Sequence, residues 1–224
     1  MALAGYCALI AYYDLQVPLP DRLAVISAKH RRYETERWAV FTVKHAPADT
    51  LAGHLTFALK NEGVDLGVLH ALFMTIKPSE VESLIKNEPT GQYSRRVWFL
   101  YEWLTEHTLE IDDVATGNYV EALDATRQYP GLSTPSRRHR VRNNLPGTRN
   151  FCPLIRRTEK LESLIAAKLS EQAKDSLGAV HPDILARAAA FLLLKDSKAS
   201  YALEGERPAF NRAERWGRAI GQAG

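Results

Sequence analysis

Apolar residues recur at helical spacing along much of the chain, most clearly in TGQYSRRVWFLYEWLTEH, residues 90–107. There Val97, Leu100, Tyr101 and Leu104 occupy the i, i+3, i+4 and i+7 positions of one helical face. This pattern predicts a helix at the packed centre of a domain.

Capping and stop residues delimit further helices. Asp, Ser or Thr at a helix start accepts hydrogen bonds from free N–H groups, and Gly or Pro marks the end. On these signals we expect helices in residues 50–62, 65–76 and 78–88, with a buried first helix near the N-terminus and another within 21–34. The alternating, β-branched stretch from Trp38 to Val43 instead predicts a short strand or hairpin.

The pattern changes after residue 115. Residues 116–157 are rich in Asn, Pro, Gly, Ser and Arg and have no helical or strand period, which predicts an irregular connector. Helical spacing then resumes. We therefore expect a mainly α-helical chain with a helical N-terminal domain in 1–115, an Arg-rich connector in 116–157 and a helical segment in 158–224.

Composition narrows the setting. The 224 residues are 46% hydrophobic and 25% charged with a formal net charge of +3, a profile typical of globular proteins that by itself implies no nucleic-acid partner. No apolar run approaches the length of a membrane span, so no membrane partner is expected. Two cysteines cannot build a disulfide framework, and the reducing cytoplasm is the expected location.

An arginine cluster in the connector is the first candidate site. Arg137, Arg138, Arg140 and Arg142 lie close together without an intervening acid, and such a run can bind the phosphates of nucleic acid or contact a partner protein. The alternative is that these arginines pair with carboxylates of the neighbouring domain or are solvated. The absence of interleaved aromatic residues favours this alternative.

A His-Pro pair at His181 and Pro182 is a weaker candidate. Proline is common at the first position of a helix, and no glycine-rich phosphate loop follows. We interpret the pair as structural.

The stretch SYALEG, residues 200–205, places Glu204 directly before the glycine that should end a helix. The C-terminal end of a helix carries partial negative charge, so a carboxylate there is mildly unfavourable. Ser200 lies one turn earlier on the same face. From the residues alone, Glu204 is either an exposed surface carboxylate, a partner for Arg207 across the turn, or a functional group whose partner lies elsewhere.

This stretch resembles the inhibitory motif of Fic proteins, [Ser/Thr]-x-x-x-Glu-[Gly/Asn]. The flanking ARAAAFLLLKDSKASYALEGERP, together with PTGQYSRRVWFLYEWL and SRRHRVRNNLPGTRNFCPLIRRTEKLE, is similar to the N-terminal region of long bacterial Fic proteins. Such proteins transfer AMP from ATP, with Mg²⁺, to a hydroxyl side chain of a target protein. The resemblance implies that Glu204 blocks productive binding of the ATP γ-phosphate, with Ser200 steadying the helix and Gly205 turning the chain away.

The catalytic loop of that family, HPFxDGNGRxxR, is absent from this sequence. We therefore expect the chain alone to be inactive in AMP transfer, to act on a Fic catalytic core in cis or in trans, and to be truncated after the first helix of that core, in 211–222. The alternative is a binding module that contacts nucleic acid or a protein through residues 137–142.

Overall fold

The computed structural model describes residues 1–29, 31–177, 182–203, 205 and 215. The chain divides into two compact units, Met1–Thr158 and Glu159–Gly224. It is mainly α-helical, with two small sheets among the described residues of the first unit. No helix in the described ranges is long and apolar enough to cross a membrane.

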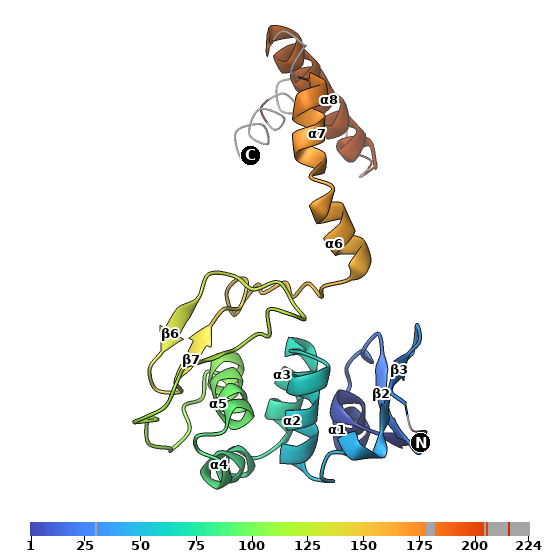
Figure 1. Ribbon diagram of the computed structural model, residues 1–224. Coiled ribbons are helices and arrows are strands. Elements are labelled where there is room, and N and C mark those ends of the chain that lie inside the picture. The colour runs from blue at the N-terminus through green and yellow to red at the C-terminus, as the bar shows by residue number, and fades with distance from the viewer. Residues whose placement is uncertain (30, 178–181, 204, 206–214, 216–224) are drawn as a thin grey trace. The chain divides into compact units, whose positions relative to one another are not determined.

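Helices form the centre of the first unit (Figure 1). Their bounds are α1 Gly5–Tyr13, α2 Leu51–Asn61, α3 Leu66–Thr75, α4 Pro78–Asn87 and α5 Gln92–Thr105. Thr50 and Asp65 cap α2 and α3 by accepting hydrogen bonds from the N–H groups of Gly53 and Val68. These helices and their caps confirm the expectations from the sequence.

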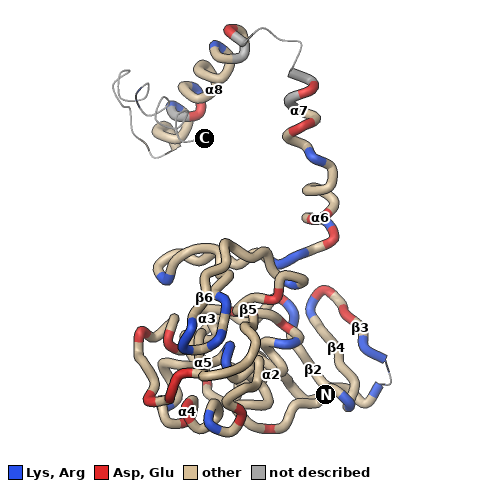
Figure 2. Tube along the Cα trace, turned by 60° about the vertical axis from the view of Figure 1, so that its left-hand side comes forward, with Lys and Arg blue, Asp and Glu red and all other residues tan. Residues whose placement is uncertain are grey.

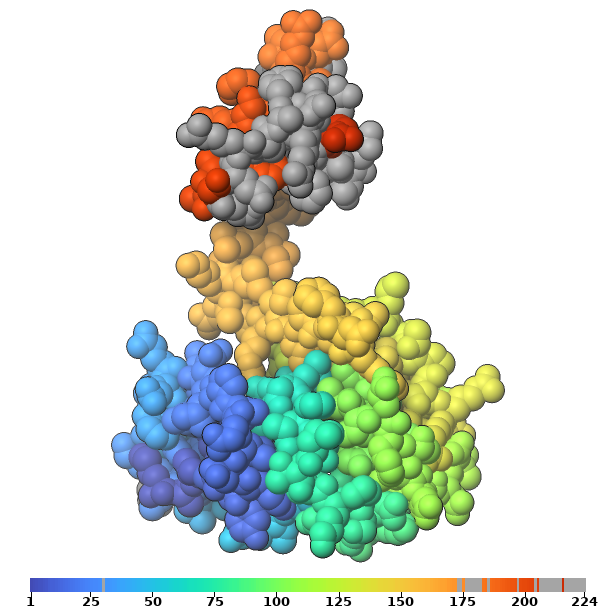
Figure 3. Space-filling model, turned by 180° about the vertical axis from the view of Figure 1, so that it is seen from behind, coloured from blue at the N-terminus to red at the C-terminus, as the bar shows by residue number. Residues whose placement is uncertain are grey.

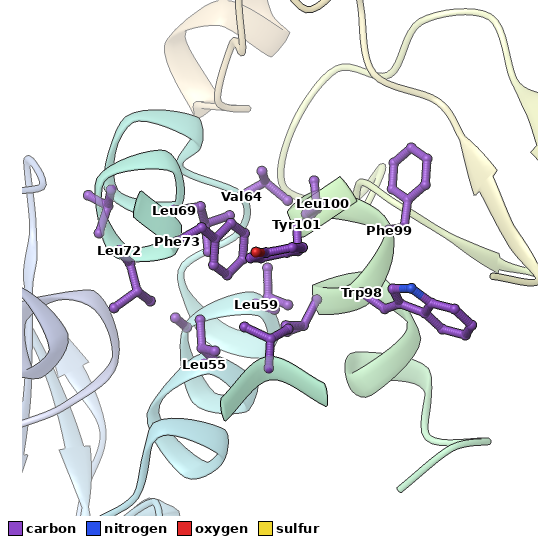
Figure 4. Close-up of a cluster of buried hydrophobic side chains, with 14 of the residues drawn as sticks. Leu55, Leu59, Val64, Leu69, Leu72, Phe73, Trp98, Phe99, Leu100 and Tyr101 are labelled. Carbon is purple, nitrogen blue, oxygen red and sulfur yellow. The ribbon is translucent and has the colours of Figure 1, made fainter. Parts of the chain in front are cut away.

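The core lies where α2, α3 and α5 pack together (Figure 4). Trp98 and Leu100 of α5 are fully buried, as are Leu55 and Leu59 of α2. The predicted central helix is therefore confirmed.

The N-terminal sheet corrects one expectation. Its strands are β1 Ala2–Leu3, β2 Leu23–Ser27, β3 Tyr33–Glu34 and β4 Trp38–Thr42, in the order β1-β2-β4-β3, and β4 continues into a 3-10 turn, η1 Val43–His45. The strand expected from Trp38 is confirmed, and β3 pairs with it as a hairpin. The helix expected within 21–34 is wrong, because Val25 pairs with Val40 in a parallel ladder.

The reason for this error is the burial of both faces of β2. Leu23, Ala24 and Val25 are buried in succession, so the strand lacks the polar alternation that marks a half-exposed strand. Its parallel partner also lies beyond the range of local sequence signals.

Residues 116–157, called the arginine arm here, belong to the first unit. They contain a second sheet of β5 Val120–Glu121, β6 Thr134–Ser136 and β7 Val141–Asn143, in the order β5-β7-β6. Leu123 and Val141 are fully buried against the helices. Figure 3 shows segments from the N-terminus (blue) to the arm (yellow) packed side by side in this unit. The arm is thus a structured layer of that unit, although the sequence pattern predicted an irregular connector.

The second unit contains α6 Glu159–Ala166, α7 Leu169–Leu177 and α8 Pro182–Leu203. The helix expected from Pro182 is confirmed. Several large apolar side chains of α6 and α8 are more than half exposed, including Ile165, Ile184 and Phe191. The expected last helix, in 211–222, falls outside the described residues apart from Arg215.

Because the arm packs against the helices of the first unit, truncation of its buried Leu123 should lower the stability of that unit. Leu123→Ala should lower the free energy of unfolding of the full chain by about 2–5 kcal/mol, because Leu123 is fully buried. Leu132→Ala is the matched control, since Leu132 lies in the same arm and is 95% exposed. It should change stability by less than about 0.5 kcal/mol. Urea unfolding followed by tryptophan fluorescence measures both, and equal effects would contradict the packing described.

Candidate functional site

The turn between β6 and β7 carries Arg137, Arg138 and Arg140, and β7 packs against α5. Figure 2 shows basic residues (blue) along the backbone near β6. Arg138 donates to both carboxylate oxygens of Glu102, from Nε at 3.2 Å to each and from Nη2 at 3.1 Å to Oε1. Its Nη1 donates to Asp113 at 2.7 Å, and its guanidinium lies 4.9 Å from the centre of the Trp98 ring. Every nitrogen of this side chain is therefore engaged within the unit, so Arg138 has no free edge for an external phosphate.

His139 extends the same network. One ring nitrogen, Nε2, lies 3.0 Å from Glu102 Oε2, and the other, Nδ1, lies 2.7 Å from Ser136 Oγ. A serine, a histidine and a carboxylate in this order are the components of a nucleophilic site. Here His139 is only 6% exposed, and the rings of Trp98 and Phe99 contact it edge to face. We interpret the trio as part of the packing between the arm and α5.

The charges of this network follow from its surroundings. Burial acts to raise the pKa of Glu102, but hydrogen bonds from Arg138 and Trp98 outweigh it and hold the pKa below its ordinary value. Burial lowers the pKa of His139 despite the nearby carboxylate. At neutral pH the network thus contains an ionised Glu102 paired with Arg138 and a neutral His139.

Arg140, the last residue of the β6–β7 turn, and Arg142, in β7, both lie near one aromatic ring. Their guanidinium groups lie 5.5 Å and 5.9 Å from the centre of Tyr119. Arg142 is exposed and reaches Glu121 at 3.5 Å, whereas the side chain of Arg140 donates only to the carbonyls of Val114 and Ala115 among the described residues. The Tyr119 ring is therefore close to both arginines in the folded chain, although no aromatic residue is adjacent to them in the sequence.

Arg95 of α5 joins this part of the arm. It is only 6% exposed, and its Nη1 donates to the carbonyls of Asn118, at 2.7 Å, and Arg140, at 3.3 Å. Its buried Nε has no hydrogen-bond partner in the described part of the chain. Arg95 is thus a buried cation next to Arg140, and the sequence interpretation overlooked it.

A second polar network fixes the turn between α2 and α3. Gln128 receives a hydrogen bond from the Val64 N–H at 2.8 Å and donates to the Val64 carbonyl at 2.9 Å. Arg127 donates to the carbonyl of Asn61 at 2.7 Å, and Arg156 donates to that of Glu62. These side chains satisfy backbone groups that α2 leaves free at its end, so the arm holds the helical core at a second point.

Glu62 lies inside this network as a buried acid. Its Oε2 accepts a hydrogen bond from the Tyr6 N–H at 3.0 Å, at the start of α1, while its Oε1 is buried without a partner among the described residues. Burial raises the pKa of Glu62 from 4.5 to about 8, more than the Tyr6 hydrogen bond and Arg156 lower it. The carboxyl group is therefore mostly protonated at neutral pH. Gly5, at φ +59°, is required here because a Cβ would collide with this carboxyl group.

The surface of the first unit contains hollows lined by charged residues. One, of about 410 Å³, lies between α4, α5 and residues 110–116, and contains Glu110, Asp112 and Asp113 together with Lys86. Another, of about 250 Å³, is lined by Asp65, Gln128, Cys152 and Arg156 among others. The described residues contain no group of three or more His, Cys, Asp or Glu side chains that could hold a metal ion.

The predicted inhibitory residues lie in the second unit, apart from the arginine arm in the chain. Ser200 is exposed in the last turn of α8, which ends at Leu203. Gly205 has φ +73°, a left-handed conformation typical of the residue that follows a helix, and its N–H donates to the Ala202 carbonyl at 3.1 Å. Glu204 lies outside the described residues, as does His181.

Comparison with known proteins identifies no similar protein. No protein-family model, curated protein or solved structure matches the chain. The resemblance to Fic proteins therefore rests on the sequence motifs alone.

The pairing of Glu102 with Arg138 predicts a loss of stability on its removal. Glu102→Gln should lower the free energy of unfolding by about 2–3 kcal/mol, because Arg138 and the Leu109 N–H lose an ionised acceptor. Glu106→Gln is the control, because it removes a largely exposed salt bridge with Arg149. It should lower the free energy of unfolding by less than about 0.5 kcal/mol. Chemical unfolding at pH 7 compares the two variants, and a Glu102→Gln protein as stable as Glu106→Gln would refute this role.

The raised pKa of Glu62 predicts a pH dependence of stability. Between pH 5 and 8 the folded chain retains a proton that the unfolded chain releases, since the pKa is about 8 when folded against an ordinary 4.5. Stability contributed by this group is therefore present at acid pH and is lost as the pH rises, by up to about 1.4 kcal/mol per pH unit.

Replacement of Glu62 by an uncharged residue tests this dependence. Glu62→Gln should flatten the fall in unfolding free energy between pH 5.5 and pH 7.5, whereas Glu88→Gln, at an exposed position, should retain it. Urea unfolding at the two pH values provides the comparison. An unchanged slope in Glu62→Gln would show that Glu62 is already ionised at neutral pH.

Proposed function

We propose that this chain is the N-terminal regulatory part of a Fic-type protein adenylyltransferase, in which Glu204 blocks productive binding of the ATP γ-phosphate by a catalytic core. The proposal takes up the resemblance of residues 200–205 to the inhibitory motif. The core acts in cis or in trans and carries the ATP and Mg²⁺ sites. The target of AMP transfer is a hydroxyl side chain of another protein.

The observation that carries this proposal is the helix end at the motif. Ser200 is exposed on the last turn of α8, and Gly205 adopts φ +73° immediately after the motif glutamate. A Cβ on Gly205 would meet no atom of the described residues within 4 Å, so φ is the reason for glycine that these residues show. The helix end supports the proposal because, in the sequence, the motif glutamate directly precedes a glycine whose conformation is typical of the residue after a helix.

The proposed inhibition is electrostatic. A carboxylate at a helix C-terminus is disfavoured by the helix dipole, and an arginine of the core would offset that cost by pairing with it. The paired arginine could not then hold the γ-phosphate. Productive binding of the γ-phosphate would require this ion pair to separate. Leaving one member of an ion pair unpaired away from water costs about 3–5 kcal/mol, so the productive binding mode would be rare.

A second candidate function is binding of nucleic acid or a protein through residues 137–142. It is favoured by Tyr119, whose ring centre lies 5.5 Å from the guanidinium group of Arg140 and 5.9 Å from that of Arg142, and by the exposure of Arg137. It is weakened by Arg138, whose donors are used within the first unit. We therefore rank it second.

The proposal predicts that Glu204→Gly activates AMP transfer. In the complete protein that carries the catalytic loop, this variant should raise self-AMP transfer from labelled ATP roughly tenfold or more, because an inhibitory pair worth several kcal/mol is lost. Glu206→Gly is the matched control, since it removes a carboxylate two residues later, outside the motif. It should leave the rate at the wild-type level. A wild-type rate in Glu204→Gly, or equal activation by both variants, would refute the proposal.

A further inference from the structure

We propose that Arg95 and Arg140, with Arg142 at the rim, form a binding site for a phosphate group beside Tyr119. This site lies in the first unit and is independent of the proposed inhibition by Glu204. It would accept free phosphate or the phosphate monoester of a small molecule.

The first observation is the burial of Arg95 without a counter-charge. Its guanidinium donates to two carbonyl oxygens, those of Asn118 and Arg140, and its Nε is left without a partner in the described residues. A buried cation is normally paired with an anion, because desolvation of an unpaired charge is costly. Arg138, on the neighbouring side of the same turn, shows the usual arrangement with Glu102 and Asp113.

The second observation is that the charged group acting on Arg95 has the same sign, since it is the guanidinium of Arg140. The Arg140 side chain donates from Nε to the Val114 carbonyl at 3.2 Å and from Nη2 to the Ala115 carbonyl at 2.7 Å. No hydrogen bond or ion pair from its Nη1 is present within the described ranges. Burial, and then the charge of Arg140, lower the pKa of Arg95, and no carboxylate of the described residues opposes them. Two guanidinium groups thus donate to carbonyls of residues 114–118, and neither forms an ion pair in the part of the chain that the structure describes.

The third observation is an accessible edge. The Arg140 side chain is half-buried, and that of Arg142 is 55% exposed with one long contact of 3.5 Å to Glu121. The Tyr119 ring lies against both guanidinium groups and limits their positions. An anion arriving from solvent would therefore meet Arg140 and Arg142 first, in the electrostatic field of Arg95.

A phosphate group fits this arrangement better than other anions. Guanidinium groups present planar N–H donors that match the spacing of phosphate oxygens. A dianion also neutralises two guanidinium charges at once, whereas chloride or a single carboxylate neutralises one.

Thermal unfolding with inorganic phosphate tests the site. At constant ionic strength and pH, phosphate should raise the Tm of the wild-type chain by roughly 3 °C over chloride when it is present at about ten times its Kd. Arg140→Asn should abolish this difference. Asparagine is chosen because Arg140 has φ +51°, a conformation that asparagine tolerates. Arg149→Asn, which removes another exposed arginine of the arm, should retain the full shift.

A measurement on the unaltered protein guards against misfolding of the variant. In ¹⁵N-arginine NMR spectra, titration with inorganic phosphate should shift the Arg140 and Arg95 Nε–H signals and leave that of Arg138 in place. No phosphate-specific Tm shift in the wild type, an equal shift in Arg140→Asn, or uniform movement of all arginine signals would overturn the proposal.

Two further probes identify the source of the phosphate group. Glycerol phosphate should give a shift at least as large as inorganic phosphate if the natural ligand is a monoester, and a smaller one if it is free phosphate. A single-stranded oligonucleotide that binds while inorganic phosphate has no effect would overturn the proposal in favour of a nucleic-acid surface.

Discussion

The carboxylate of Glu102 joins the helical core of the first unit to its arginine arm. It accepts hydrogen bonds from Trp98 on its own helix, from the Leu109 N–H, and from Arg138 of the arm, and it contacts His139. Because this carboxylate is largely buried, all of these donors depend on it for a hydrogen-bond acceptor. The position of the β6–β7 turn, and with it the placement of Arg140 and Arg142, therefore depends on one acid of α5.

The arm is held at a second place by different chemistry. Gln128 and Arg156 bind backbone groups of the turn between α2 and α3, where a helix end leaves carbonyls unpaired. Residues 155–157 also pair with residues 127–129 by backbone hydrogen bonds, so the chain is fixed to the first unit just before α6 begins. In the proposed function, this unit is a stable body that precedes the helical segment with the inhibitory motif.

Local signals predicted the helices well and the long-range pairings poorly. Thr50 and Asp65 act through hydrogen bonds within three residues, so α2 and α3 could be delimited from sequence. The β2–β4 ladder is parallel and its strands are separated in the chain, so no local signal marks it.

The same limit applies to the candidate sites. Arg138 was recognised as a member of a basic cluster, but its partner Glu102 lies 36 residues away. Tyr119 and Arg95 were not predicted as site residues because they are also distant in the sequence from the arginines that they approach. The adjacent Arg95 and Arg96, within the apolar pattern of α5, could have indicated a buried cation. The helix end at Gly205 was predictable because glycine acts locally, and the chemistry assigned to Glu204 comes from resemblance rather than from this chain's own contacts.

A crystal structure of this chain together with a Fic catalytic core, ATP and Mg²⁺ would show whether Glu204 inhibits the core as proposed. We expect Glu204 to be paired with an arginine of the catalytic loop and the γ-phosphate to lie away from that arginine. A structure in which Glu204 is solvated while the same arginine holds the γ-phosphate would contradict the proposed inhibition.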